Sequence, residues 1–144
     1  MIVNTAYIYM GSGGGGGEPA NPNLWQNGVS NYPVEFTNSS IKAEGLIFVT
    51  GRGDATFSEL PLKYFNRLTL TGHITNGPTR TSEISIEFYS SDNVLIGTTT
   101  AKFARSEKSV TVDIPSSAKI QNAKIKIKKT DYSSSLKFSS AVLS

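Results

Sequence analysis

Apolar and polar residues alternate along several short segments of this chain, and this alternation restricts its fold more than any other feature. The alternating segments, with one short apolar run at the first position, are residues 46–49, 67–74, 84–89, 110–114, 124–128 and 136–139. A period of two is typical of strands with one buried face and one exposed face. Turn-forming residues separate the segments, as at Asn76-Gly77-Pro78. The pattern predicts an all-β fold, an antiparallel jelly-roll β-sandwich.

The first 22 residues differ in composition from the rest of the chain. Residues 1–10 are apolar and β-prone, whereas residues 11–22 are rich in Gly and Pro, with Glu18 as the only charge. The Gly/Pro-rich segment at 11–22 cannot bury enough apolar surface to adopt an ordered structure by itself. We therefore predict a docking arm at 1–10, a flexible linker at 11–22 and the jelly-roll domain at 23–144.

The arm is predicted to dock by strand pairing, because a strand-forming segment on a tether suits β-augmentation or intertwining of several copies. The docking side chains would be Ile2, Val3, Tyr7, Ile8 and Tyr9. The sequence leaves open whether the arm joins its own domain, a sister copy or a different protein. We expect a homo-oligomer, with a trimer favoured.

The composition excludes sites built on cysteine and membrane-spanning segments. The chain has no cysteine and no apolar stretch near the length of about 20 residues that a membrane span needs. It lacks a basic and apolar start of the kind found in secretory signals, so we expect folding in a cytosol.

Residues 101–144 hold nine basic and three acidic side chains. We interpret Lys124, Lys126 and Lys128 as the solvent face of a half-buried strand or a protected edge strand, with polyanion binding as the alternative. We expect neither nucleic-acid binding nor membrane insertion.

No motif selects a catalytic centre, so we predict that the chain is not an enzyme and needs no cofactor or metal. His73 is the only histidine, and no nucleophile motif accompanies it. Glu83 and Glu87 share one polar phase, but a spacing of about 13 Å along a strand is too long for a glycosidase pair.

Aromatic residues fall into two groups. Six phenylalanines are expected in the core: Phe36, Phe48, Phe57, Phe88, Phe103 and Phe138. Four other rings are candidates for exposed stacking platforms that bind sugar: Trp25, Tyr64, Tyr89 and Tyr132. Packing at the core or rim is the alternative role for each of these four.

The tetrapeptide Gly51-Arg52-Gly53-Asp54 follows the apolar run at 46–49. Its glycines favour a tight connection between strands. Arg52 and Asp54 are therefore candidates for an exposed loop that contacts a partner.

From residue 23 on, the chain resembles the galactose-binding-like jelly rolls found in carbohydrate-binding modules. The matching stretches are NLWQNG at 23–28, FNRLTLTGHI at 65–74, SEISIEFYSSDNVLIG at 82–97, SVTVDIP at 109–115, AKIKIKK at 123–129 and LKFSSAVLS at 136–144. The resemblance implies a jelly-roll fold. Members of that fold bind sugars, proteins or no known ligand, so the fold alone does not give the ligand.

The opening MIVNTAYIYMG with its Gly/Pro linker resembles small structural proteins of phages and prophages of Gram-positive hosts. This resemblance implies that the arm docks onto the virion while the domain behind it varies.

We therefore expect a non-enzymatic phage virion protein, anchored by its arm to the tail or baseplate and displaying a sandwich for host attachment. A capsid decoration or head-fibre protein is one alternative. A carbohydrate-binding module that contacts a host cell-surface glycan is another.

Overall fold

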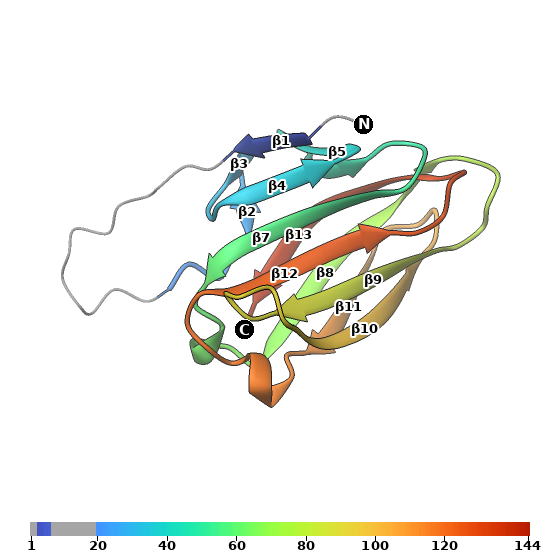
Figure 1. The fold of residues 1–144 in the computed structure, drawn as a ribbon. Helices are drawn as coiled ribbons and strands as arrows, with labels where there is room; N and C mark the ends of the chain where they lie inside the picture. The colour runs from blue at the N-terminus through green and yellow to red at the C-terminus, as the bar shows by residue number, and fades with distance from the viewer. Residues whose placement is uncertain (1–2, 7–19) are drawn as a thin grey trace.

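The computed structural model describes the backbone of residues 3–6 and residues 20–144. Two antiparallel sheets lie face to face (Figure 1). Across these described residues the only helical segments are two single turns of 3-10 helix, η1 (Leu62–Tyr64) and η2 (Ser116–Ala118). The predicted all-β sandwich is confirmed.

One sheet has six strands, and its order in space differs from its order in the chain. From edge to edge its strands are β1 (Val3–Ala6), β4 (Val34–Thr37), β7 (Gly53–Leu60), β12 (Ala123–Lys129), β9 (Ser82–Tyr89) and β10 (Leu95–Phe103). Strand β12 thus lies in the middle of the sheet, between β7 and β9. This position makes the edge-strand interpretation of its lysines wrong and their solvent-face interpretation right.

The second sheet has five strands. Its order is β11 (Lys108–Asp113), β8 (Arg67–Asn76), β13 (Ser135–Leu143), β6 (Gly45–Phe48) and β5 (Ser39–Lys42). A short hairpin of β2 (Trp25–Gln26) and β3 (Val29–Ser30) lies between β1 and β4 in the chain. Since most neighbouring strands are distant in sequence, the chain crosses repeatedly between the sheets, as a jelly roll requires.

The core lies between the sheets and is filled by the apolar phase of each strand. All six phenylalanines expected there are buried. The ring of Phe138 makes edge-to-face contacts with Phe103 and Phe48, at centroid distances of 5.0 and 5.8 Å. Gly72 makes room for this cluster, because a Cβ there would lie 2.5 Å from a ring carbon of Phe138. Each buried phenylalanine stabilises the fold by about 1.5–3 kcal/mol.

Strand β1 joins the sheet of its own chain, at its edge. It pairs antiparallel with β4, in a register that runs from Val3 opposite Thr37 to Ala6 opposite Val34. The other predicted docking residues, Ile2, Tyr7, Ile8 and Tyr9, lie outside the described residues.

The end of the segment predicted as a linker is bonded to the domain. Asn21 accepts a hydrogen bond from the Tyr32 hydroxyl at 2.7 Å, through its carbonyl oxygen. Leu143 donates its backbone N–H to the Pro22 carbonyl, also at 2.7 Å. The chain is therefore held to the sandwich from Asn21 onward.

A lysine interrupts the apolar phase of β12 at its last residue. Lys129 is fully buried, and its ammonium donates to the Asp131 carbonyl at 2.7 Å and lies 3.8 Å from that residue's Oδ1. Burial lowers the pKa of Lys129, and the Asp131 carboxylate partly opposes this shift.

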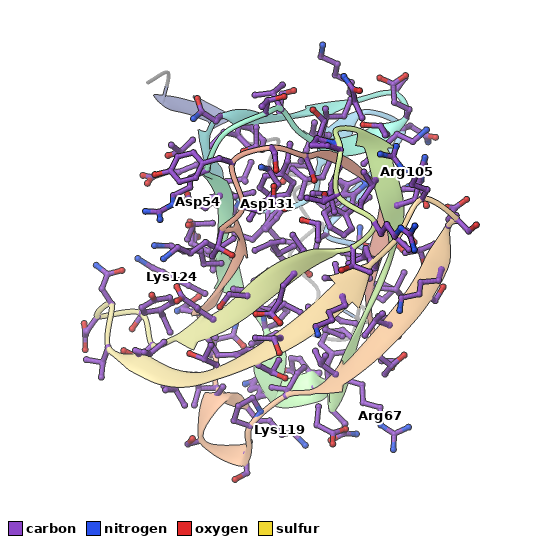
Figure 2. All side chains as sticks on the ribbon, turned by 90° about the vertical axis from the view of Figure 1, so that its right-hand side faces the viewer. Asp54, Arg67, Arg105, Lys119, Lys124 and Asp131 are labelled. Atoms are coloured by element: carbon purple, nitrogen blue, oxygen red, sulfur yellow. The ribbon has the colours of Figure 1, made fainter. Side chains whose placement is uncertain are left out.

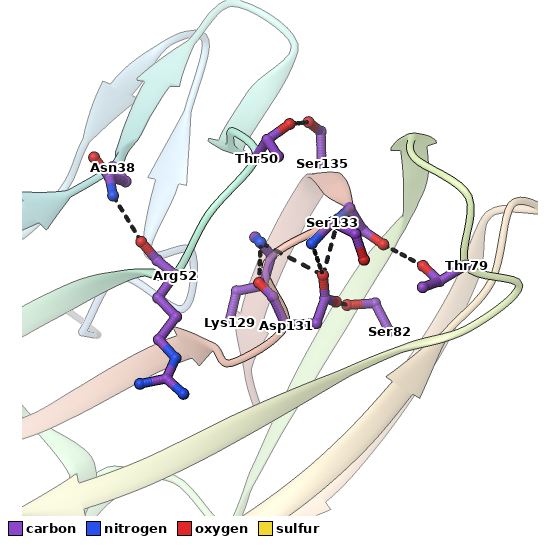
Figure 3. A network of polar contacts seen from close by, with 10 residues as sticks. Asn38, Thr50, Arg52, Thr79, Ser82, Lys129, Asp131, Ser133 and Ser135 are labelled. Carbon is purple, nitrogen blue, oxygen red and sulfur yellow. Dashed lines mark hydrogen bonds and ion pairs between the residues drawn. The ribbon is translucent and has the colours of Figure 1, made fainter.

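The Asp131 carboxylate organises the loop between β12 and β13 (Figure 3). Its Oδ1 accepts the backbone N–H groups of Ser133 and Ser134 at 3.0 and 2.9 Å, and Ser82 of β9 donates its hydroxyl to Oδ2. Burial raises the pKa of Asp131, but the hydrogen bonds from Ser82 and Ser134 outweigh it, so the net shift is downward. This network fixes the loop that links the six-stranded sheet to the five-stranded sheet.

Candidate binding groove

A polar groove lies on the outer face of the six-stranded sheet. Its volume is about 360 Å³, and its lining residues come from four strands and one turn: Glu35, Thr56, Ser58, Tyr89, Asn93, Lys124 and Lys126. We call this site the groove. Figure 2 shows Lys124 at the surface of the molecule, on the same side as Asp54.

Strand register places the lining residues in rows. Thr56 is paired with Glu35 on one side and with Lys126 on the other, and Lys126 is paired with Glu87. Side chains of directly paired residues stand on the same face of an antiparallel sheet. The polar phases of β4, β7, β12 and β9 therefore meet in one line across the sheet.

A β-bulge shapes the floor of the groove. The pairing of β12 with β7 shifts from Ala123–Leu60 to Ile125–Phe57, which leaves one extra residue on β7. Glu59 in this bulge has a φ of 55°, and the N–H of Ser58 donates to the Pro33 carbonyl at 2.9 Å. A bulge bends its strand and redirects side chains. Ser58 consequently lines the groove beside Thr56.

The ring of Tyr89 forms one wall, and its orientation is fixed from two sides. The hydroxyl donates to Oε1 of Glu87 at 2.7 Å, and Nζ of Lys126 lies 5.5 Å from the ring centroid. Burial, together with the hydrogen bond to Glu87, raises the pKa of Tyr89 to about 12. The phenol is therefore neutral at physiological pH, and a cation over its ring face is a favourable contact.

Asn93 at the turn between β9 and β10 positions the second lysine. It adopts a φ of 64°, and its N–H donates to the Ser90 carbonyl at 3.0 Å. The Nζ of Lys124 donates to Oδ1 of Asn93 at 2.6 Å. Lys124 and Lys126 stand on one face of β12, so their Cα atoms are about 6.7 Å apart.

Two exposed apolar residues follow Asn93. Val94 is 60% exposed and Leu95 is 52% exposed. Leu95 is paired with Tyr89, which in turn is paired with Lys124, so these three side chains share the outer face. An apolar lip therefore borders the Tyr89 side of the groove.

Of the four rings predicted to bind a ligand, only Tyr89 lines the groove. The expectation that Trp25 is an exposed platform is wrong. It is only 3% exposed, stacks on Phe57 at 5.8 Å and donates its Nε1–H to the Ser139 carbonyl at 3.3 Å. Burial removes the large apolar ring from water, and the Ser139 carbonyl accepts its single N–H donor.

The other two predicted rings are exposed but stand elsewhere. Tyr64 in η1 is 64% exposed, and Tyr132 in the loop between β12 and β13 is 62% exposed. The guanidinium of Arg52 lies 4.7 Å from the centroid of the Tyr132 ring. The exposed-loop prediction holds for Arg52 but not for Asp54, which is a half-buried residue of β7. Burial raises the pKa of Asp54, with Lys126 and Lys128 opposing the shift.

Most lining residues were not predicted as site residues from the sequence: Glu35, Thr56, Ser58, Asn93, Lys124 and Lys126. The local signal of the strand residues is only their polar phase, which every half-exposed strand has, and that of Asn93 is only its place in a turn. The strand order brings them together, and no local pattern encodes that order.

Other kinds of site find little support in the part of the chain that the structure describes. No group of three or more His, Asp or Glu side chains there is arranged to hold a metal ion. No helix in residues 20–144 is long and apolar enough to cross a membrane. His73 lies on the five-stranded sheet, paired with Lys137.

No family model matches the sequence, and no curated protein matches it. Among solved structures, the chain is similar to a family two carbohydrate esterase from Cellvibrio japonicus, with 11% identity and a TM-score of 0.50 over 99% of this chain and 34% of that one. The chain thus spans about a third of the length of that esterase.

Two further solved structures are similar to the chain. TmCBM61 in complex with beta-1,4-galactotriose has 12% identity and a TM-score of 0.49, over 77% of this chain and 81% of that one. A family 11 carbohydrate-binding module from Clostridium thermocellum, in complex with a beta-1,3-1,4-mixed-linked tetrasaccharide, has 11% identity and a TM-score of 0.47, over 99% and 82%. At these identities the likeness concerns the fold alone.

Proposed function

We propose that this chain is a non-catalytic carbohydrate-binding sandwich and that the groove is its binding site. The observation that carries the proposal is the convergence of one fixed aromatic ring, Tyr89, with hydroxyl, amide and charged groups in a cavity of about 360 Å³. Cavities of about 300–1,000 Å³ with a few placed polar groups are typical of small-ligand sites.

The chemistry of the groove suits a sugar ring. A pyranose has an apolar face, which the Tyr89 ring and the Leu95 lip accommodate, and an edge of hydroxyl groups. Thr56, Ser58 and Asn93 offer uncharged hydrogen-bonding groups to that edge. Binding needs no general acid or base, and the neutral Tyr89 phenol is already engaged by Glu87.

A glycan array tests this proposal. The full chain is expected to bind one group of glycans saturably. Tyr89→Ala is expected to lose about tenfold in affinity, because it removes the one aromatic ring that lines the groove. Tyr64→Ala is the matched control, because Tyr64 is exposed and lies outside the groove. Both variants should keep the melting temperature. Equal loss in both variants, or no glycan bound at all, would overturn the proposal.

We further propose that residues 1–10 anchor the domain to a phage particle, at the tail or baseplate, with a capsid decoration or head-fibre protein as the alternative. In support, β1 pairs with the edge of a complete sandwich, and a Gly-rich segment joins it to residue 20. The same pairing formed between copies would give the expected homo-oligomer.

Deletion of residues 1–10 tests the anchoring role. The truncated chain should keep the melting temperature of the full chain within a few degrees and fail to enter particles. Native mass spectrometry of both chains tests the trimer. A truncated chain that unfolds would instead make β1 an integral strand of its own domain.

A further inference from the structure

Neither lysine of the groove forms an ion pair within 4 Å in the described part of the chain. In residues 20–144 the ion pairs within 4 Å are Arg67–Asp113, at 3.4 Å, and Lys129–Asp131, at 3.8 Å. Neither involves Lys124 or Lys126. The groove therefore presents two ammonium groups whose charge is not balanced by direct contact.

Neutral groups hold both ammonium groups in place. The amide oxygen of Asn93 accepts from Lys124 at 2.6 Å, and the Tyr89 ring lies 5.5 Å from the Lys126 nitrogen. Such contacts restrict the side chains without removing their charge. The two lysine side chains would then lose less conformational entropy when an anion binds than freely rotating lysines would.

The nearby carboxylates are distributed unevenly around the two lysines: Glu87 is paired directly with Lys126 and the charge of Asp54 also acts on it, whereas Lys124 is paired with Tyr89. Glu87 is engaged by the Tyr89 hydroxyl at 2.7 Å. Glu35 is paired with Thr56, which is paired with Lys126, so Glu35 stands two strands from Lys126. Two strand spacings amount to about 10 Å. The groove thus has at Lys124 an ammonium group with no carboxylate paired opposite it, and the Glu35 carboxylate lies at the other side.

We propose that the groove takes an anionic saccharide, a sugar that carries a carboxylate or phosphate group. The anion would lie against Lys124 and Lys126, and the sugar hydroxyls would face Thr56, Ser58 and Glu35. Lysine ammoniums act as point charges, which suits either anion. This inference rests on the proposed carbohydrate-binding function and names the ligand class for the same groove.

A matched pair of oligosaccharides tests the inference by calorimetry on the full chain. Trigalacturonate and a galactose trisaccharide of the same linkage differ in the carboxylates at C6. We expect the acidic trisaccharide to bind at least about tenfold more tightly, and its affinity to fall about tenfold between 50 and 500 mM NaCl, because salt screens exposed charges. A galactose 6-phosphate series distinguishes phosphate from carboxylate as the preferred anion.

Two variants assign the effect to the groove. The double variant Lys124→Met and Lys126→Met should lose the preference for the acidic sugar and its salt dependence. Lys128→Met is the matched control, because Lys128 is on the same face of the same strand but does not line the groove. Circular dichroism and melting temperature should be unchanged in all variants.

The outcomes separate this inference from the proposed function. Equal or tighter binding of neutral sugar, insensitive to salt and lost in Tyr89→Ala, would overturn the anionic ligand while leaving the carbohydrate-binding function in place. An effect of Lys128→Met as large as that of the double variant would overturn the assignment to the groove. Absence of binding to every acidic and neutral glycan on the array would overturn both.

Discussion

The outer face of the six-stranded sheet carries charged side chains on most of its strands, whereas that of the five-stranded sheet carries rows of hydroxyl groups on β8 and β11, beside the Arg67–Asp113 ion pair. The charged side chains of the first face are Glu35, Asp54, Glu83, Glu87, Lys102, Lys124, Lys126 and Lys128. On the second face hydroxyls pair with each other across β8 and β11. Thr69 and Thr111 are 2.8 Å apart, and Thr71 and Ser109 are 2.7 Å apart.

The difference concerns how each face satisfies its polar groups. Hydroxyls of the five-stranded sheet bond to one another across β8 and β11. The lysines of the groove bond to neutral groups and keep their charge. Two faces built by the same alternation therefore satisfy their polar groups differently, and the following predictions test that difference.

The largest effect is expected at the loop that both sheets share. Asp131→Ala removes the carboxylate that holds two backbone N–H groups and leaves the buried Lys129 ammonium without its counter-ion. We expect a loss of about 3 kcal/mol in the free energy of unfolding, because an unpaired buried charge is costly. Chemical denaturation at pH 7 measures it.

The loss of stability caused by Asp131→Ala depends on pH in a defined way. The folded pKa of Asp131 lies below its ordinary value of 3.8, so its contribution is present above that pH and is lost as pH falls through the folded pKa. Tyr132→Ala in the same loop is the control and should change stability little, since this side chain is 62% exposed. Equal losses of stability in Asp131→Ala and Tyr132→Ala would contradict the conclusion that the Asp131 carboxylate fixes this loop.

The next effect concerns the Tyr89 phenol. Glu87→Gln removes the negative charge that helps to raise its pKa to about 12, so that pKa should fall toward the ordinary value of 10.0 while burial keeps part of the shift. Ultraviolet titration, with Tyr89→Phe as the reference that identifies this residue's signal, measures the change. A titration curve that Glu87→Gln leaves unaltered would show that burial alone sets the pKa.

A smaller effect is expected from a charge beside the groove. Burial raises the pKa of Asp54 above 3.8, so the folded state disfavours its charged form and stability falls as pH rises through that range. Asp54→Asn should therefore stabilise the chain at pH 7 by less than about 1 kcal/mol after solvent screening. Denaturation curves at pH 7 and pH 3 should show the difference only at the higher pH.

The smallest effect is expected on the hydroxyl face. Thr71→Val removes an exposed cross-strand hydrogen bond to Ser109 and should change the free energy of unfolding by no more than about 0.5 kcal/mol. Glycan binding should be unchanged. A loss of binding in this variant, with the fold intact, would move the site from the six-stranded sheet to the five-stranded sheet.

Local pattern accounts for the strands and for most of the core. Alternation places Leu68, Ile84 and Ile127 in the buried phase, and all three are buried. The reason is that successive side chains of a strand point to opposite faces, so every second residue faces the core. The register and order of the strands depend on contacts between distant segments. The meeting of Glu35, Thr56 and Lys126 in one row is therefore not written in any one stretch.

Two residues show where local reasoning is insufficient. Trp25 follows a polar segment and resembles a rim residue in sequence, but Phe57 and the Ser139 carbonyl bury it. Lys129 occupies the apolar phase of β12, where a lysine is unexpected, and Asp131 two residues later is the signal that explains it. A charge on a buried phase followed by an opposite charge indicates such a pair.

The groove residues project from hydrogen-bonded strands, apart from Asn93 in a tight turn. Entry of a ligand then requires no loop to close, and the encounter itself sets the association rate. Differences in affinity among related ligands would therefore appear mainly in how long each complex lasts. Stopped-flow and surface-based measurements would resolve such residence times.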